Sequence, residues 1–159
     1  VLDPVMVAKS GDTLLADSAI DALKSILFAR ATLLTPNLPE ALKLVGEGST
    51  QAQAQALLDL GVGAVLMKGG HADGETCTDH LVLQTGTQDF LAPRVNTCNT
   101  HGTGCSYSSA IAAGLAQGMA LSDAVSHAHT WLHQAILHAD ELRVGQGNGP
   151  VHHFHALWK

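Results

Sequence analysis

Short, mostly apolar runs alternate along the first half of the chain with longer stretches in which apolar residues recur every three to four positions. The runs at 1–7, 32–35 and 64–67 predict buried strands. The spaced stretches predict helices over about 18–29, capped by Asp17 or Ser18, from Asn37 onward, and over 50–60. Because strands and helices alternate, the pattern predicts a parallel sheet with right-handed crossovers.

The second half of the chain has a different pattern. Strand-like stretches around 81–83 and 89–91, joined at 85–87, predict an antiparallel hairpin at the edge of the sheet. Long helices follow over about 103–118 and 122–142, and a turn at 145–150 precedes a short terminal element. The predicted fold class is therefore α/β, a doubly wound and mostly parallel sheet flanked by helices.

Composition narrows the possible partners. The 159 residues, 46% of them hydrophobic, fit one globular domain. A net charge of -6 without any basic run argues against nucleic acid, and no apolar stretch reaches membrane-spanning length, so we expect a soluble protein with no membrane partner. Three cysteines without a C-x-x-C pair favour a reducing compartment, by default the cytoplasm.

The polar features that could carry chemistry follow strand ends. They are Asp3, Asn37 with Glu40, the segment 68–71 and the segment 99–105. In doubly wound sheets ligands bind at the carboxyl ends of the strands, so these features predict one site at that edge.

The most distinctive feature is the turn at 102–104, followed by Cys105 and a helix of small residues. Glycines let the backbone approach a ligand, and the free N–H groups at a helix start bind phosphate or a developing oxyanion. The same dipole favours a thiolate at Cys105, which makes it a candidate base or nucleophile. The alternative is a small residue that fills space.

Five ordered motifs resemble those of the hydroxymethylpyrimidine/phosphomethylpyrimidine kinase family, the thiamine-pathway members of the ribokinase-like superfamily. The motifs are DPVMVAKSGD at 3–12, TPNLPEA at 35–41, LMKGGH at 66–71, NTHGTGC at 99–105 and GPVHHF at 149–154. The resemblance implies a ribokinase-like fold and ATP-dependent phosphorylation of 4-amino-5-hydroxymethyl-2-methylpyrimidine, then of its monophosphate. It also implies that residues 1–159 are one kinase domain without the Gly-rich strand with which family members begin.

The resemblance also implies roles for individual residues. Cys105 would accept the alcohol proton, and the backbone N–H groups of Gly102, Thr103 and Gly104 would hold the transferring phosphoryl group. Most ribokinase-like sugar kinases carry Asp at the position of Cys105. His101 would orient this turn.

The metal site implied by the resemblance consists of Asn37 and Glu40, which resemble an element that holds Mg²⁺, and of Asp3, which resembles an aspartate near the metal and phosphates. For Asn37 and Glu40 the alternative is a helix cap with a first-turn Glu.

ATP contacts are expected after two strands. Lys68 would place a point charge on the phosphates, and Gly69 and Gly70 would let the nucleotide approach. Thr100 would contribute a hydroxyl, and Gly149, in the 147–150 turn, a weaker contact. For Lys68 the alternative is a strand-end lysine whose stem covers apolar surface.

Several alternatives remain open at this point. One alternative is a vitamin B6 kinase of the same superfamily, which phosphorylates a similar flat heterocycle. Another, from a different functional class, is a non-catalytic fragment or ligand sensor. Among ten histidines, His129 and His133 have a spacing compatible with a metal pair, although packing beside the helix core is favoured. Superfamily analogy implies a homodimer that acts on a small pyrimidine.

Overall fold

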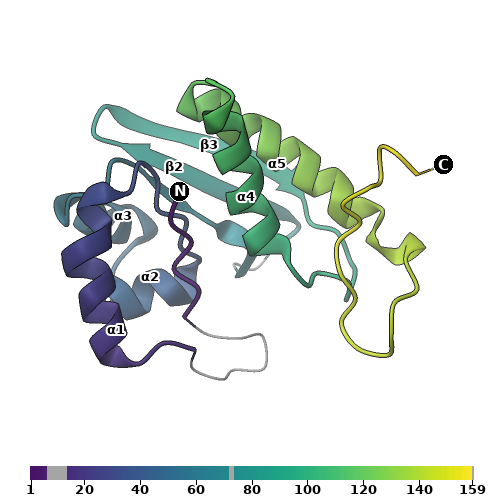
Figure 1. The fold of residues 1–159 in the computed structure, drawn as a ribbon, viewed down its shortest axis with the longest axis horizontal. Coiled ribbons are helices and arrows are strands. Elements are labelled where there is room, and N and C mark those ends of the chain that lie inside the picture. The colour runs from purple at the N-terminus through teal and green to yellow at the C-terminus, as the bar shows by residue number, and fades with distance from the viewer. Residues whose placement is uncertain (7–13, 72–73, 159) are drawn as a thin grey trace. The chain divides into compact units, whose positions relative to one another are not determined.

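The computed structural model describes residues 1–6, 14–71 and 74–158, which form two compact units, Val1–Leu91 and Ala92–Lys159 (Figure 1). The end of the strand predicted over 1–7 and the second half of the motif at 3–12 lie outside the described residues. The predicted α/β class is confirmed, since helices and extended segments are mixed along the chain.

A three-stranded sheet lies mostly in the first unit, and its last strand ends just beyond Leu91. Its order is β1 (Val65–Met67), β2 (Thr76–Leu83) and β3 (Gly86–Pro93), and β2 runs antiparallel to β1 with Leu66 opposite Leu81. The predicted hairpin is confirmed, and only residues 84 and 85 connect its strands. Alternating burial toward the end of β3, where Phe90 and Ala92 face inward, matches a half-buried strand.

Two further extended segments continue the sheet beyond β1 in the parallel direction. Parallel bridges join Leu2 to Leu34 and Leu34 to Val65. The N–H of Leu66 donates to the Leu34 carbonyl at 2.8 Å, and the N–H of Lys68 donates to the Pro36 carbonyl at 2.9 Å. The carboxyl ends of three parallel segments therefore meet at one edge, as the sequence predicted.

Helices α1 (Asp17–Ala22), α2 (Leu38–Val45) and α3 (Thr50–Asp59) complete the first unit. The helical path of α1 continues through a π-helical turn, Leu23–Leu27, and a 3₁₀ turn, Phe28–Arg30. The predicted cap by Asp17 or Ser18 is wrong, because Ala16 is the extended N-cap residue and Asp17 lies in the first turn, where its charge meets the positive helix end. The core of this unit is mostly aliphatic and includes Met6, Phe28, Leu34, Leu57, Val65 and Met67.

The second unit is built on two adjacent helices, α4 (Thr103–Ala116) and α5 (Leu121–Leu137) (Figure 1). A Cβ at Gly114 would lie 3.1 Å from the Ala124 Cβ, so the glycine permits this close approach. The helix predicted to reach residue 142 ends earlier, and a 3₁₀ turn, Ala139–Glu141, follows it. Within the described ranges, no helix is both long and apolar enough to span a bilayer.

Candidate active site

Asp3 and Lys68 meet at the carboxyl edge of the sheet in the first unit. The Lys68 Nζ lies 2.9 Å from the Asp3 Oδ1, with side chains 14% and 12% exposed. The Thr35 hydroxyl donates to the same oxygen at 3.1 Å. The structure thus brings together two predicted site residues that are 65 positions apart in the sequence.

Asn37 and Glu40 form a reciprocal cap at the start of α2. The Asn37 side-chain oxygen accepts from the Glu40 N–H at 2.8 Å, and the Glu40 carboxylate accepts from the Asn37 N–H at 2.8 Å. The capping interpretation is confirmed. A role in metal binding stays a prediction.

Glu40 is unusual because it is a carboxyl group with only 5% of its surface exposed. Burial raises its pKa above 4.5, although the Asn37 N–H and the Lys68 charge oppose the rise, and the nearby Asp3 charge adds to it. Glu40 and Asp3 therefore share one ammonium group. A divalent cation with oxygen preference fits this excess of negative charge, and Mg²⁺ commonly binds through only one or two carboxylates and phosphates.

The stability of the fold is expected to depend on pH through Glu40. Because its pKa in the folded state is raised, the stabilising contribution is present near pH 4.5 and is lost as the pH rises through the folded pKa. Urea unfolding from pH 4.5 to neutrality should show a decline for the parent protein that Glu40→Gln lacks. Glu47→Gln, at an exposed carboxylate, should leave the decline intact, and the same slope in both variants would contradict this assignment.

Gly69 follows Lys68 and lies directly against β2. A Cβ at this position would lie 1.9 Å from the Thr78 carbonyl oxygen, and the Gly69 N–H donates to the Asp79 Oδ1 at 2.8 Å. Packing alone thus requires this glycine, and its predicted role toward the nucleotide stays a prediction. Asp79, buried at 8% exposure, was missed by the sequence analysis.

Gly69→Ala is expected to destabilise the protein by about 1–3 kcal/mol, since the methyl group would displace backbone rather than a flexible side chain. Gly70→Ala is the matched control, because a Cβ there has no neighbour within 4 Å among the described atoms. Thermal unfolding of the two variants measures the difference. Equal midpoints would show that β2 moves aside without cost.

The glycine-rich turn lies in the second unit, at the start of α4. Gly102, with φ at +82°, is the N-cap residue in a left-handed conformation that favours glycine. In the part of the chain that the structure describes, no side chain caps this helix. The N–H groups of its first turn have no intrahelical partners, although that of Thr103 donates to the Thr100 carbonyl at 3.4 Å, and Cys105, in that turn, is exposed.

A distant segment fixes the entrance to this turn. The His101 N–H donates to the Gly149 carbonyl at 3.0 Å, and the Val151 N–H donates to the His101 carbonyl at 3.2 Å. The Asn99 side-chain oxygen accepts from the Gly149 N–H at 2.9 Å, and a Cβ at Gly149 would lie 2.3 Å from that oxygen. A side chain at Gly149 would displace the Asn99 amide, whereas the predicted ATP contact of Gly149 stays a prediction. His101 is bound to this segment through its backbone, and its role in orienting the turn stays a prediction.

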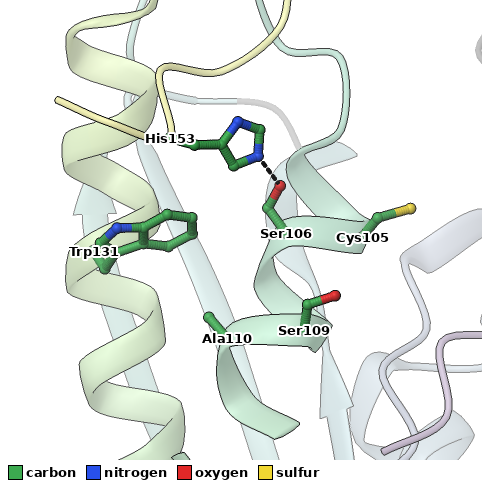
Figure 2. A pocket seen from close by; sticks show the side chains of 6 residues that line it. All are labelled: Cys105, Ser106, Ser109, Ala110, Trp131 and His153. Atoms are coloured by element: carbon green, nitrogen blue, oxygen red, sulfur yellow. Dashed lines mark hydrogen bonds between the residues drawn. The ribbon is translucent and has the colours of Figure 1, made fainter. Parts of the chain in front are cut away.

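A shallow hollow of about 440 Å³ lies beside the first turn of α4, and Figure 2 shows its lining side chains. The Ser106 hydroxyl and the His153 Nε2 are 2.7 Å apart and join the C-terminal segment to the helix. In this view the Cys105 thiol points away from Trp131 and His153. The sequence predicts no role for His153, because its partner lies 47 residues earlier.

His129 and His133 pack within the second unit. The His133 Nε2 donates to the Pro93 carbonyl at 3.1 Å, and the His129 ring lies 6.2 Å from the Tyr107 ring between centroids. Across residues 1–6, 14–71 and 74–158, no three His, Cys, Asp or Glu side chains are grouped to hold a metal ion. The packing interpretation of this pair is confirmed.

Comparison with known families identifies the chain's relatives. The family model described as phosphomethylpyrimidine kinase matches residues 1–152. The chain belongs to the phosphomethylpyrimidine kinase family. The resemblance drawn from the five motifs is thereby confirmed.

Relatives of this family member have the predicted fold and are longer. The hydroxymethylpyrimidine/phosphomethylpyrimidine kinase of Escherichia coli (strain K12) is 51% identical over 164 residues, which cover 99% of this chain and 62% of the relative. A pyridoxal kinase of Bacillus subtilis, solved as an ADP complex, superposes with a TM-score of 0.85 at 31% identity, over 97% of this chain and 60% of that one. A phosphomethylpyrimidine kinase of Clostridium difficile gives 0.70 at 35% identity, over 84% and 55%. The chain therefore spans about three fifths of the length of these relatives, and the ribokinase-like fold is confirmed.

Proposed function

We propose that this chain carries the phosphate-binding and proton-accepting part of a kinase. The reaction transfers the γ-phosphoryl group of ATP to the hydroxymethyl oxygen of 4-amino-5-hydroxymethyl-2-methylpyrimidine, and then phosphorylates the resulting monophosphate. The observation that carries the proposal is the uncapped start of α4 at Gly102, with the exposed Cys105 in its first turn. The names of the E. coli and C. difficile relatives support the choice of substrate.

Phosphoryl transfer requires mainly positioning and charge stabilisation. The N–H groups of Gly102, Thr103 and Gly104 would donate to the oxygens of the transferring group. As the substrate oxygen bonds to phosphorus and the bond from phosphorus to the ADP oxygen breaks, the alcohol proton passes to the Cys105 Sγ. Thr100 would add a hydroxyl to the phosphates.

The charged cluster of the first unit would serve the nucleotide. Lys68, held by Asp3, would contribute a point charge to the phosphates. Asp3, Glu40 and Asn37 would hold Mg²⁺, which neutralises phosphate charge when bound. The Asn37 side-chain oxygen accepts one hydrogen bond in the cap and has a second lone pair for this purpose.

The setting of the activity is also a proposal. We expect a homodimer by analogy with ribokinase-like relatives, acting on small molecules in the cytoplasm. The compartment rests on three cysteines without a C-x-x-C pair, all of which are free in the described structure.

A second candidate activity is phosphorylation of pyridoxal, which the TM-score of 0.85 to a pyridoxal kinase favours. A coupled assay of ADP release with hydroxymethylpyrimidine, its monophosphate and pyridoxal separates the two. It should be run on this chain and on a chimera that adds the portion of the E. coli relative outside the match. We expect the pyrimidines to be the better substrates. Preference for pyridoxal would support the second candidate, and no ATP binding by calorimetry in either protein would support the non-catalytic reading.

A further inference from the structure

We propose that Asp140 is a positioning residue of the turn at 99–105, an inference that rests on the proposed function. Asp140 lies in the 3₁₀ turn Ala139–Glu141 that follows α5, and its side chain is exposed. Its Oδ1 accepts from the Asn99 Nδ2 at 2.8 Å and from the Thr97 hydroxyl. One carboxylate oxygen therefore receives two donors from the chain that enters the turn.

Asp140 decides which end of the Asn99 amide faces the C-terminal segment. An ionised carboxylate only accepts hydrogen bonds, so it selects the NH₂ end of the amide. The carbonyl end of Asn99 is then directed at the Gly149 N–H, which donates to it at 2.9 Å. Thr97 reinforces the arrangement, because its oxygen accepts from the Asn99 N–H at 3.0 Å while its hydroxyl donates to Asp140.

The oriented amide fixes the backbone next to the anion-binding turn. With Gly149 held by Asn99, the Gly149 carbonyl is placed to accept from the His101 N–H at 3.0 Å. His101 directly precedes Gly102, the N-cap residue of α4. The direction of the first-turn N–H groups therefore depends on a chain of hydrogen bonds that begins at Asp140, and a shift of about 1 Å at such donors costs catalysis far more than stability.

The neighbouring Glu141 provides a matched control. It is exposed, lies in the same 3₁₀ turn, and pairs with the His138 Nδ1 at 2.6 Å rather than with the entering chain. Removal of either exposed carboxylate should change stability little. Only removal of Asp140 should change the turn.

The experiment compares Asp140→Ala, Asp140→Asn and Glu141→Ala by two measurements: kcat and KM for ATP, and amide hydrogen exchange at residues 99–104 and 149–151 without nucleotide. For Asp140→Ala we expect kcat about 10- to 100-fold lower, with a smaller change in KM. Exchange at His101, Gly149 and Val151 should be roughly tenfold faster. Asp140→Asn offers donors as well as an acceptor, so it should select the orientation of the Asn99 amide less strictly and fall between Asp140→Ala and the parent protein in both measurements. Glu141→Ala should match the parent protein.

The two measurements separate the inference from the proposed function. If Asp140→Ala matches Glu141→Ala in hydrogen exchange, Asp140 does not position the turn, whatever happens to kcat. If Asp140→Ala exchanges faster than a parent protein that itself transfers no phosphate, the positioning of the turn is supported and the kinase proposal is overturned. Unchanged kcat with faster exchange would show that the turn is held by Asp140 but not used in the rate-limiting step, which would overturn the positioning role in catalysis.

Discussion

Cys105→Ala should lower turnover by about 10²- to 10⁴-fold, the range lost when a general base is removed. The thiol is exposed in the first turn of α4 and takes no part in the core, and alanine is a good helix former. The thermal midpoint and the KM for ATP should therefore stay near their parent values. Steady-state kinetics with hydroxymethylpyrimidine, alongside thermal unfolding, measures both.

Two variants control this experiment. Cys98→Ala removes another exposed thiol of the same unit and should keep full turnover. Cys105→Asp replaces the thiol by a carboxylate, another proton acceptor, and should recover part of the lost rate. Full turnover in Cys105→Ala, or none regained in Cys105→Asp, would mean that the proton leaves by another route.

Lys68→Met is expected to raise the KM for ATP by about 10- to 100-fold, because a hydrogen bond from a charged donor contributes about 1.5–3 kcal/mol. The substitution also leaves Asp3, at 12% side-chain exposure, without its ammonium partner and should lower the thermal midpoint. Nucleotide kinetics and unfolding together report both effects.

The double variant Asp3→Asn/Lys68→Met separates charge from stability. It also removes the negative charge that Lys68→Met leaves without an ammonium partner, so the thermal midpoint should recover while the KM for ATP stays high. Lys43→Met, at an exposed lysine in the last turn of α2, should change neither quantity. An unaltered KM in Lys68→Met would restrict Lys68 to a structural partner of Asp3.

Local signals account for what the sequence predicted well. The cap at α2 could be predicted because Asn37 and Glu40 are three residues apart, and the side chain of each accepts a hydrogen bond from the backbone N–H of the other. The hairpin could be predicted because two strand-like stretches flank a short connection. Asp3 and Lys68 were placed at one edge because parallel strands end together.

Contacts across long sequence distances account for what was missed. Nothing near Asp140 in the sequence indicates that its acceptors serve Thr97 and Asn99, 43 and 41 positions earlier. From the sequence, Gly69 is predicted to be a ligand-binding glycine, and only the structure shows that it packs against β2. Asp79 stands between polar residues on a strand, so nothing in the sequence distinguishes it. Its role is visible only in the structure, where it accepts a hydrogen bond from the Gly69 N–H.

The contact between Asn99 and Gly149 spans 50 positions of the chain. Closing so long a loop costs entropy that is recovered only once α4 and α5 have packed together. During synthesis from the N-terminus, the residues of the turn leave the ribosome well before the segment that fixes their geometry. The anion-binding turn should therefore be among the last parts of this protein to become ordered, after the helices on which it stands.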